Sequence, residues 1–463
     1  MIASEIRTPT AAGIYRPVLR AMSQTGAAAL ASGLLSAIAT KIIAVVGGPA
    51  ALAILSTLQQ VRQAAVVAAT GNGQTALVRG ASALGGRERS EFVRSVACVF
   101  AAATALVMGG MVLWPQSLAA LAGFGPGASR LIPWLAIPVA LTSLLVLASA
   151  LLNALGDIGR LAILPVIGSA AMAAGAWPAA RAFARGQRGA LVALLIFSSA
   201  VSGISAVVAL VRFRGQMHEW FRGPGRWWSG EAARSFATMS ATMLASGLAA
   251  SGTLLAVRRH IILTQGLGVT GQFDAAWGLS MNQVTLVLAS LQTYYLPAVA
   301  RSRNREERDA HISSVLTVAA LASAGVIAGI AVLKPRLLTM LYSAAFEPAA
   351  IYLRWTLLGD YLKVTSWILS IPILAAQDMK MFLAADLAAY GVFVAVAMGL
   401  SPSMTAASGA AMGFVAMYTT HLLLCAIYMS RKLGFVPTRR ALGAWILGLS
   451  VVTAVSAVSW DQT

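Results

Sequence analysis

Thirteen apolar runs, each about as long as a helix that crosses a lipid bilayer, follow one another along this chain with short gaps between them. A helix needs about 20 predominantly apolar residues to cross the hydrocarbon core. Only 11% of the 463 residues are charged and 58% are hydrophobic, whereas soluble proteins average about 25% charged residues. The sequence therefore predicts an all-α polytopic membrane protein. The runs lie near residues 24–46, 49–71, 94–114, 131–154, 161–180, 189–211, 235–259, 275–297, 312–333, 351–376, 380–400, 406–430 and 440–459.

The runs form two sets of six, followed by one extra run. We expect an N-terminal lobe at residues 1–211, a cytoplasmic inter-lobe linker at 212–234, a C-terminal lobe at 235–432 and an extra C-terminal transmembrane helix at 433–463. Because six is an even number, the lobes are predicted to be parallel repeats, related by a pseudo-twofold axis along the membrane normal around a central cavity. The linker is the longest gap, and it is expected to hold at most an interfacial helix.

The basic residues between the runs set the expected orientation. Cytoplasmic loops are enriched in Lys and Arg, and here these residues gather before the first run and in the even-numbered gaps. The N-terminus is therefore expected to be cytoplasmic. Arg181, Arg185 and Arg188 lie in the fifth gap and depart from this pattern. The net charge of +19 follows largely from these loops, and no basic cluster interleaved with aromatic residues indicates a nucleic-acid partner.

Charged side chains inside the runs are the main candidates for function. Each costs about 2.5–3.5 kcal/mol on insertion scales, and such residues usually face a cavity or a partner. They are Lys41, Arg62, Arg258, Arg259, Asp274, Asp360, Lys363, Asp386 and His421. The other three histidines and the two cysteines have no spacing typical of a metal site. We therefore expect no metal and no cofactor.

A polar stripe runs along the second span. Ser56, Gln59, Gln60 and Gln63 recur at spacings of three and four, so they share one face of a helix, with Arg62 at its flank. Such a stripe at bilayer depth fits a water-filled cavity and a hydrogen-bonded seam between helices equally well.

The tenth run carries Asp360 and Lys363, which are three residues apart and can pair on one helix face. Two apolar residues would cost less than a buried ion pair, so we favour a role in a cavity over mutual neutralisation. The eighth run places Asp274 and Asn282 along one side, and Asp386 lies in the eleventh run.

The two sets of spans also begin alike. Lys41 precedes the turn GGPAA at residues 47–51, and Arg258 and Arg259 precede GQFDAA at 271–276. Parallel repeats would place these cations face to face across the outer half of the central cavity. Opposed cations at that depth suit an anionic group.

Three motifs resemble those of a known family. They are KIIAVVGGPAALAILSTLQQ at residues 41–60, SLQTYYLPAVARS at 290–302 and YLRWTLLGDYLKVTSWILSIPILA at 352–375. In this order they resemble Wzx-type polysaccharide flippases of the multidrug/oligosaccharidyl-lipid/polysaccharide exporter (MOP) superfamily, nearest to its lipid III flippases. The resemblance covers most of residues 24–430.

This resemblance implies a V-shaped, MATE-like bundle of two six-helix lobes in the bacterial inner membrane. An undecaprenyl-diphosphate-linked oligosaccharide would cross from the cytoplasmic to the periplasmic leaflet by alternating access. It also implies charged positions at Lys41, Arg259, Asp360 and Lys363 and an acidic one at Asp386. Met281 departs from the pattern, because close relatives carry an acid there, and the thirteenth span is extra.

We therefore expect a flippase for an O-antigen, lipid III or exopolysaccharide repeat unit. Lys41, Arg62, Arg258, Arg259 and Lys363 are expected to bind the diphosphate, Gln59, Gln60, Gln63 and Asn282 to line a polar cavity, and Asp274, Asp360 and Asp386 to act in coupling or switching. Expected partners are membrane lipid, a polysaccharide polymerase and a chain-length regulator, with the flippase itself a monomer. The alternative is a cation-coupled multidrug exporter of the same superfamily. An enzyme is not expected, because the outer gaps are short and hold no paired carboxylates.

Overall fold

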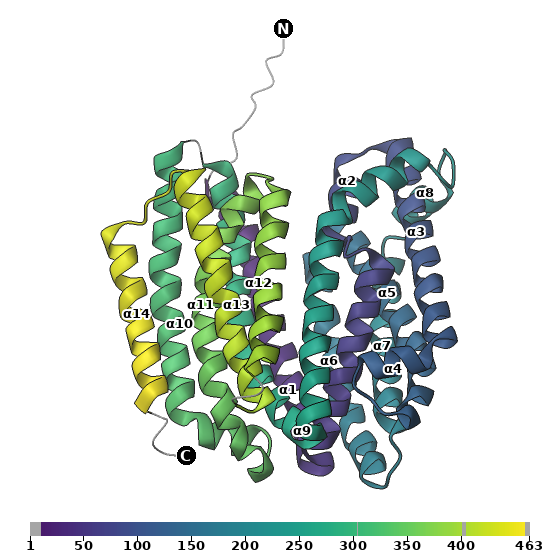
Figure 1. Cartoon of the computed structure of the whole chain (residues 1–463). Helices are drawn as coiled ribbons and strands as arrows, with labels where there is room; N and C mark the ends of the chain where they lie inside the picture. The colour runs from purple at the N-terminus through teal and green to yellow at the C-terminus, as the bar shows by residue number, and fades with distance from the viewer. Residues whose placement is uncertain (1–10, 303, 401–403, 459–463) are drawn as a thin grey trace.

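The computed structural model describes residues 11–302, 304–400 and 404–458, and in these residues every regular element is a helix (Figure 1). The elements are α1 (Ala11–Thr70), α2 (Gln74–Ala83), α3 (Gly86–Leu113), α4 (Pro115–Leu121), η1 (Pro126–Leu131), α5 (Ile132–Ala154), α6 (Ile158–Ala184), α7 (Gly189–Val211), α8 (Arg214–Arg222), α9 (Gly230–Arg301), α10 (Arg305–Leu341), η2 (Ala344–Ala349), α11 (Ala350–Ala375), α12 (Met379–Gly399), α13 (Ala406–Arg431) and α14 (Arg439–Val458).

Eleven of the described helices are long and apolar enough to span a membrane. Two of them, α1 and α9, are each interrupted by one glycine with non-helical backbone angles, and each therefore provides two of the thirteen predicted spans. The expectation of an all-α polytopic membrane protein is confirmed.

The interruptions in α1 and α9 have the same backbone geometry. Gly48 has φ 72° and ψ −175°, and Gly266 has φ 81° and ψ 178°. A positive φ with an extended ψ is open essentially to glycine alone, because any other residue would place its Cβ against the backbone. The second turn therefore lies at Gly266, and our expectation that it falls at 271–276 is corrected.

Replacing Gly266 with alanine is expected to lower the free energy of unfolding by about 1–3 kcal/mol, because alanine would be held in a strained region of backbone space. Thermal unfolding of the purified protein in detergent measures the change. Gly268→Ala is the matched control, since a Cβ there would meet no atom within 4 Å. Equal unfolding temperatures for the two variants would contradict the assignment of the turn to Gly266.

Several elements of the two halves repeat at one offset. Gly48 and Gly266 are 218 residues apart, and the same offset relates η1 to η2 and the first residue of α5 to that of α11. The side chains of Asp157 and Asp378 cap the next helices in the same way, each accepting a hydrogen bond from the backbone N–H three residues later. The offset also makes Lys41 equivalent to Arg259, and Ser56 equivalent to Asp274.

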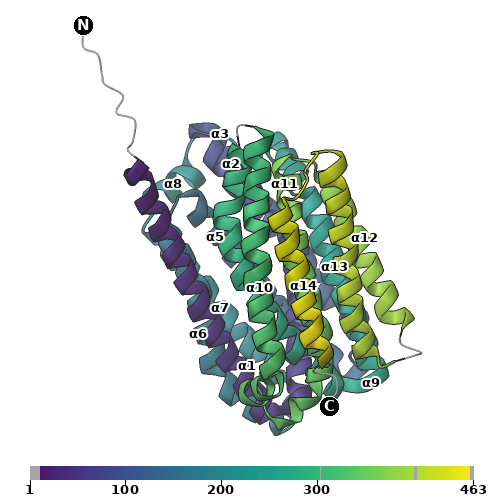
Figure 2. The same cartoon turned by 90° about the vertical axis from the view of Figure 1, so that its left-hand side faces the viewer.

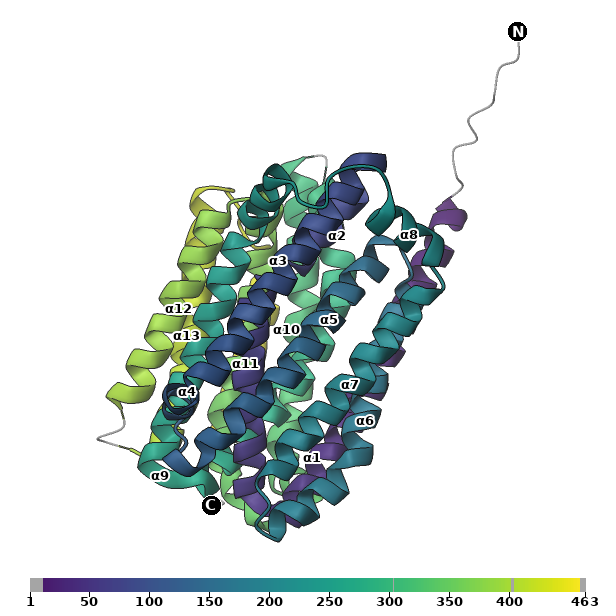
Figure 3. The ribbon, with the colours of Figure 1, turned by 90° about the vertical axis from the view of Figure 1, so that its right-hand side faces the viewer.

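The two halves stand side by side, and α10, α12, α13 and α14 lie on the opposite side of Figure 1 from α2, α3, α5 and α8. We call the end of the bundle at which residue 11 lies the near end, and the end at which α1 and α9 turn the far end. The ribbons of the two halves stand apart at the near end and meet towards the far end (Figure 1). Figure 2 shows α1 running along α6, and the hydroxyl oxygens of Ser32 in α1 and Ser169 in α6 lie 2.8 Å apart. Figure 3, which views the bundle from the other side, shows α3, α5, α6 and α7 towards the viewer.

The segment between α7 and α9 carries one short helix, α8, within residues 212–234, where at most an interfacial helix was expected. Trp220 of α8 is buried. The guanidinium of Arg94 in α3 donates hydrogen bonds to the carbonyl oxygens of Gly223 and Pro224, at 3.0 and 3.2 Å. These contacts fix the segment to the near end of α3.

Candidate functional site

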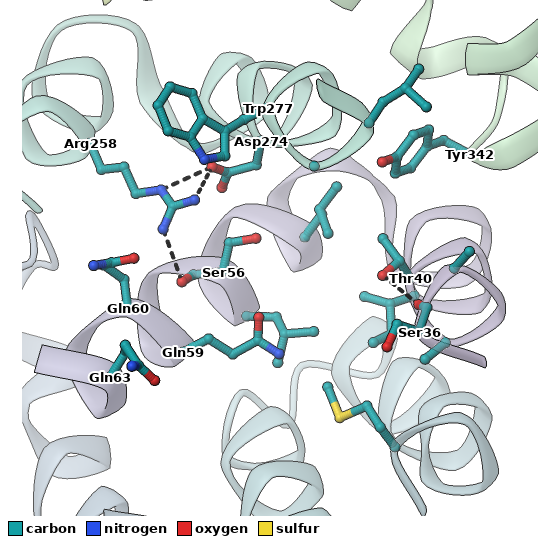
Figure 4. A pocket seen from close by; sticks show the side chains of 18 of the residues that line it. Ser36, Thr40, Ser56, Gln59, Gln60, Gln63, Arg258, Asp274, Trp277 and Tyr342 are labelled. Carbon is teal, nitrogen blue, oxygen red and sulfur yellow. Dashed lines mark hydrogen bonds and ion pairs between the residues drawn. The ribbon is translucent and has the colours of Figure 1, made fainter. Parts of the chain in front are cut away.

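A cavity of about 480 Å³ lies between the two halves. Its walls come from both segments of α1 and α9, with Met172 of α6 and the end of α10 completing them. Its polar lining includes Ser36, Thr40, Ser56, Gln59, Gln60, Gln63, Arg258, Asp274 and Tyr342 (Figure 4). Arg62 also lines it. The sequence alone fits a water-filled cavity and a hydrogen-bonded seam between helices equally well. The structure places the polar stripe of the second span along a cavity wall.

Arg258 and Asp274 form a buried ion pair at one edge of this cavity (Figure 4). The Arg258 Nε and Nη2 atoms donate to the same Asp274 oxygen, Oδ1, at 2.9 and 2.6 Å. Nη1 donates to the carbonyl oxygen of Ser56, at 3.2 Å, so the pair also ties α9 to α1. The charge of Arg258 is compensated as long as this pair is formed.

Arg62 has different surroundings. Its Nη1 atom donates to the hydroxyls of Thr142 and Ser199, at 3.1 and 3.0 Å. Both acceptors are neutral, and within the described residues no carboxylate forms an ion pair with Arg62 and its buried Nε has no hydrogen-bond partner. An uncompensated cation in the wall of a cavity attracts an anion. Because a charge at this depth destabilises the fold, its presence indicates such a functional role.

Three of the five expected cations, Lys41, Arg259 and Lys363, do not line the cavity. Lys41 is exposed and lies on the helix face of Leu30, Leu34, Ile38 and Val45, which are at least 50% exposed, as is typical of a surface towards lipid. Arg259 is also exposed, and its Nε atom donates to the carbonyl oxygen of Ala120 in α4, at 2.9 Å. The structure therefore does not bring this equivalent pair face to face across the cavity.

Asp360 and Lys363 are buried in α11 and line neither this cavity nor the second one described below. The Ser280 hydroxyl donates to Asp360 Oδ2, at 2.6 Å. Lys363 Nζ lies 3.2 Å from the sulfur of Met281 and within 6 Å of the ring centroids of Trp367 and Tyr418. The side chain of Asn282 lies outside the described residues.

A second cavity, of about 330 Å³, lies between the first segment of α9 and the helices α11, α12 and α13. Asp386 lines it, and its two carboxylate oxygens contact different groups: Oδ2 accepts a hydrogen bond from Ser246, and Oδ1 lies 3.4 Å from His421 Nε2. Trp367, Tyr390 and Tyr418 also line this cavity. Each of them lies three or four residues from Lys363, Asp386 or His421 in its own run, and this helical spacing is the signal that could have identified them.

No family model matches this chain. The lipid III flippases of Escherichia coli (strain K12) and Shigella flexneri are each 22% identical to it over 240 residues, which cover 52% of this chain and 56% of the flippase. The match thus spans about half the length of these curated relatives.

Solved structures match nearly the whole chain. The lipid II flippase MurJ, in an inward closed conformation, has a TM-score of 0.69 at 14% identity over 95% of this chain and 99% of that one. An inward-facing multidrug resistance MATE family transporter of the MOP superfamily has a TM-score of 0.67 at 15% identity, over 93% and 96%. A eukaryotic MATE transporter has a TM-score of 0.59 at 12% identity, over 93% and 99%.

These likenesses define the class of fold: the chain has the two-lobe architecture of MurJ and the MATE transporters. The relatives found are flippases and transporters rather than enzymes. The similarity to lipid III flippases and the structural likeness to MurJ and a MATE transporter of the MOP superfamily agree with the resemblance seen in the sequence, and the helices are those of a multi-pass membrane protein.

Proposed function

We propose that this protein moves an undecaprenyl-diphosphate-linked oligosaccharide across the bacterial inner membrane by alternating access. The observation that carries the proposal is Arg62, an uncompensated cation in the wall of a polar cavity shared by the two halves. A diphosphate is an anion with many hydrogen-bond acceptors, and the planar guanidinium of arginine suits it well. Gln59 and Gln63 supply amide donors on the same cavity wall.

The remaining cations have different roles in this proposal. Arg258 becomes a second ligand of the diphosphate when it leaves Asp274. Lys41 and Arg259 are exposed on helix surfaces, where they act on the headgroup before or after it occupies the cavity. Lys363 lines neither cavity and lies within 6 Å of the ring centroids of Trp367 and Tyr418, so it positions these rings and does not contact the diphosphate.

Three carboxylates are proposed to couple transport to a change of conformation. Asp274, Asp360 and Asp386 each accept a hydrogen bond from a side chain of α9, namely those of Arg258, Ser280 and Ser246. A proton or a phosphate can replace one of these hydrogen bonds. It shifts the equilibrium between the two conformations of the transporter only if it binds one of them more tightly than the other.

The near end is proposed to face the cytoplasm, with the N-terminus on that side. The arginines that bind and surround α8 support this orientation. The glycan is an O-antigen, lipid III or exopolysaccharide repeat unit in this proposal. A polysaccharide polymerase and a chain-length regulator are its partners, and the flippase is a monomer.

A cation-coupled multidrug exporter is the second candidate. The likeness to MATE transporters and the acidic, aromatic second cavity favour it. Against it, the only acid of the first cavity, among the described residues, is already paired with Arg258.

Reconstitution distinguishes the two functions. Purified protein is placed in liposomes with a fluorescent undecaprenyl diphosphate lipid, and dithionite quenching measures the fraction that reaches the protected leaflet. We expect faster exchange than in protein-free liposomes and no accumulation of ethidium. Ethidium transport without lipid exchange would overturn the proposal in favour of the exporter.

A further inference from the structure

The second cavity combines aromatic faces with convergent hydrogen-bonding groups. Trp367 and Tyr418 provide rings, while Asp386, His421 and Asn72 provide acceptors and donors. Ligand pockets in proteins have volumes of about 300–1,000 Å³ and are lined mainly by apolar and aromatic side chains with a few placed polar groups. At about 330 Å³, this cavity meets that description.

One face of α9 lines both cavities. Met243, Gly247 and Ala250 line the second cavity, and Leu254 and Arg258 line the first. These residues recur at spacings of three and four, so they form one continuous face of a helix. Twelve residues separate Ser246 from Arg258, which corresponds to about 18 Å along the helix axis. A molecule with its anionic end in the first cavity can therefore extend along α9 into the second.

The chemistry of the second cavity suits a sugar. A pyranose ring presents a face of C–H groups that packs on an aromatic ring, and its hydroxyls donate hydrogen bonds to carboxylates and amides. Within the described lining of this cavity, Asp386 is the only carboxylate, and its contacts with Ser246 and His421 fix its orientation. A bare diphosphate would be repelled by it.

We propose that the second cavity is the binding site for the glycan of the transported lipid, with Trp367 as the stacking platform and Asp386 as the acceptor for sugar hydroxyls. This inference rests on the proposed function and divides the substrate between two sites: the diphosphate lies by Arg62 and Arg258, and the sugar lies by Trp367 and Asp386.

Binding of two lipids tests this division. Native mass spectrometry of the purified protein measures the affinity for undecaprenyl diphosphate and for the glycosylated undecaprenyl diphosphates extracted from the bacterium that carries the gene. Trp367→Leu is expected to bind the glycosylated lipids about tenfold more weakly, as expected for loss of an aromatic contact of about 1.4 kcal/mol, and to bind the bare lipid as the wild type does. Trp367→Phe, which keeps a ring, is expected to recover most of the loss.

The controls separate this inference from the proposed function. Trp134→Leu removes an exposed tryptophan of α5 outside both cavities and should leave both affinities unchanged. Equal affinity of Trp367→Leu and wild type for the glycosylated lipids would overturn the glycan site and leave the proposed function standing. Failure of the wild-type protein to bind either lipid overturns the proposed function, and with it the inference.

Discussion

Replacing Gly271 with valine is expected to abolish transport by preventing the far end from closing. A Cβ at residue 271 would lie 1.9 Å from the carbonyl oxygen of Pro49 and 2.5 Å from its carbonyl carbon. These are backbone atoms at the turn of α1, so no rotamer change relieves the clash, and the turns of α1 and α9 must separate. Because alternating access requires each end to close in turn, a protein open at the far end cannot complete the cycle.

Thiol labelling shows whether the far end has opened. Cysteine at Thr40, which lines the first cavity, is introduced into a Cys98→Ser protein and exposed to a membrane-impermeant maleimide from the far side. We expect labelling in Gly271→Val and none in Gly268→Val, since a Cβ at residue 268 would meet nothing within 4 Å.

Cys425 reports on unfolding in the same experiment, because it is 1% exposed and reacts only if the C-terminal half opens. Labelling of Thr40→Cys alone would show a change of conformation. Normal transport by Gly271→Val, with protein at the wild-type level, would show that the turns need not touch.

The span pattern was predictable because it depends on length and apolarity alone. The turn in the second half was misplaced because GLGVTG, at residues 266–271, offers three glycines. Gly266 supplies the positive φ of the turn, whereas Gly271 supplies the close approach to Pro49. Both demands select glycine, and only the three-dimensional arrangement distinguishes them.

The first cavity was partly predictable and the second was not. The stripe from Ser56 to Gln63 lines the first cavity, because polar residues at helical spacing share a face whatever that face meets. Lys41 was placed with the cavity because it lies within a span and because the expected repeat sets it opposite Arg258 and Arg259, although its neighbours at helical spacing, Leu34 and Ile38, are apolar and exposed. The second cavity depends on Ser246, Asp386 and His421, which come from three helices (α9, α12 and α13), and no spacing along one helix shows that they meet.

Replacing Arg62 with glutamine is expected to reduce lipid exchange in liposomes at least 30-fold, equivalent to about 2 kcal/mol, which is typical of a central arginine in a binding site. Arg62→Lys keeps the charge but loses the planar set of donors, and we expect it to be intermediate. Arg181→Gln is the control of equal charge change, since this exposed arginine stacks on Trp177 outside both cavities.

Stability and transport should change independently in the Arg62 variant. An uncompensated cation among membrane helices destabilises the fold, because its desolvation is offset only by the hydroxyls of Thr142 and Ser199. Arg62→Gln should therefore unfold at the same temperature as the wild type or at a higher one, while exchange of undecaprenyl diphosphate is lost. A variant that loses stability and transport together would mark Arg62 as a packing residue, and one that retains full exchange would remove the anion site. Stable protein without transport is the outcome that requires an anion in the cavity.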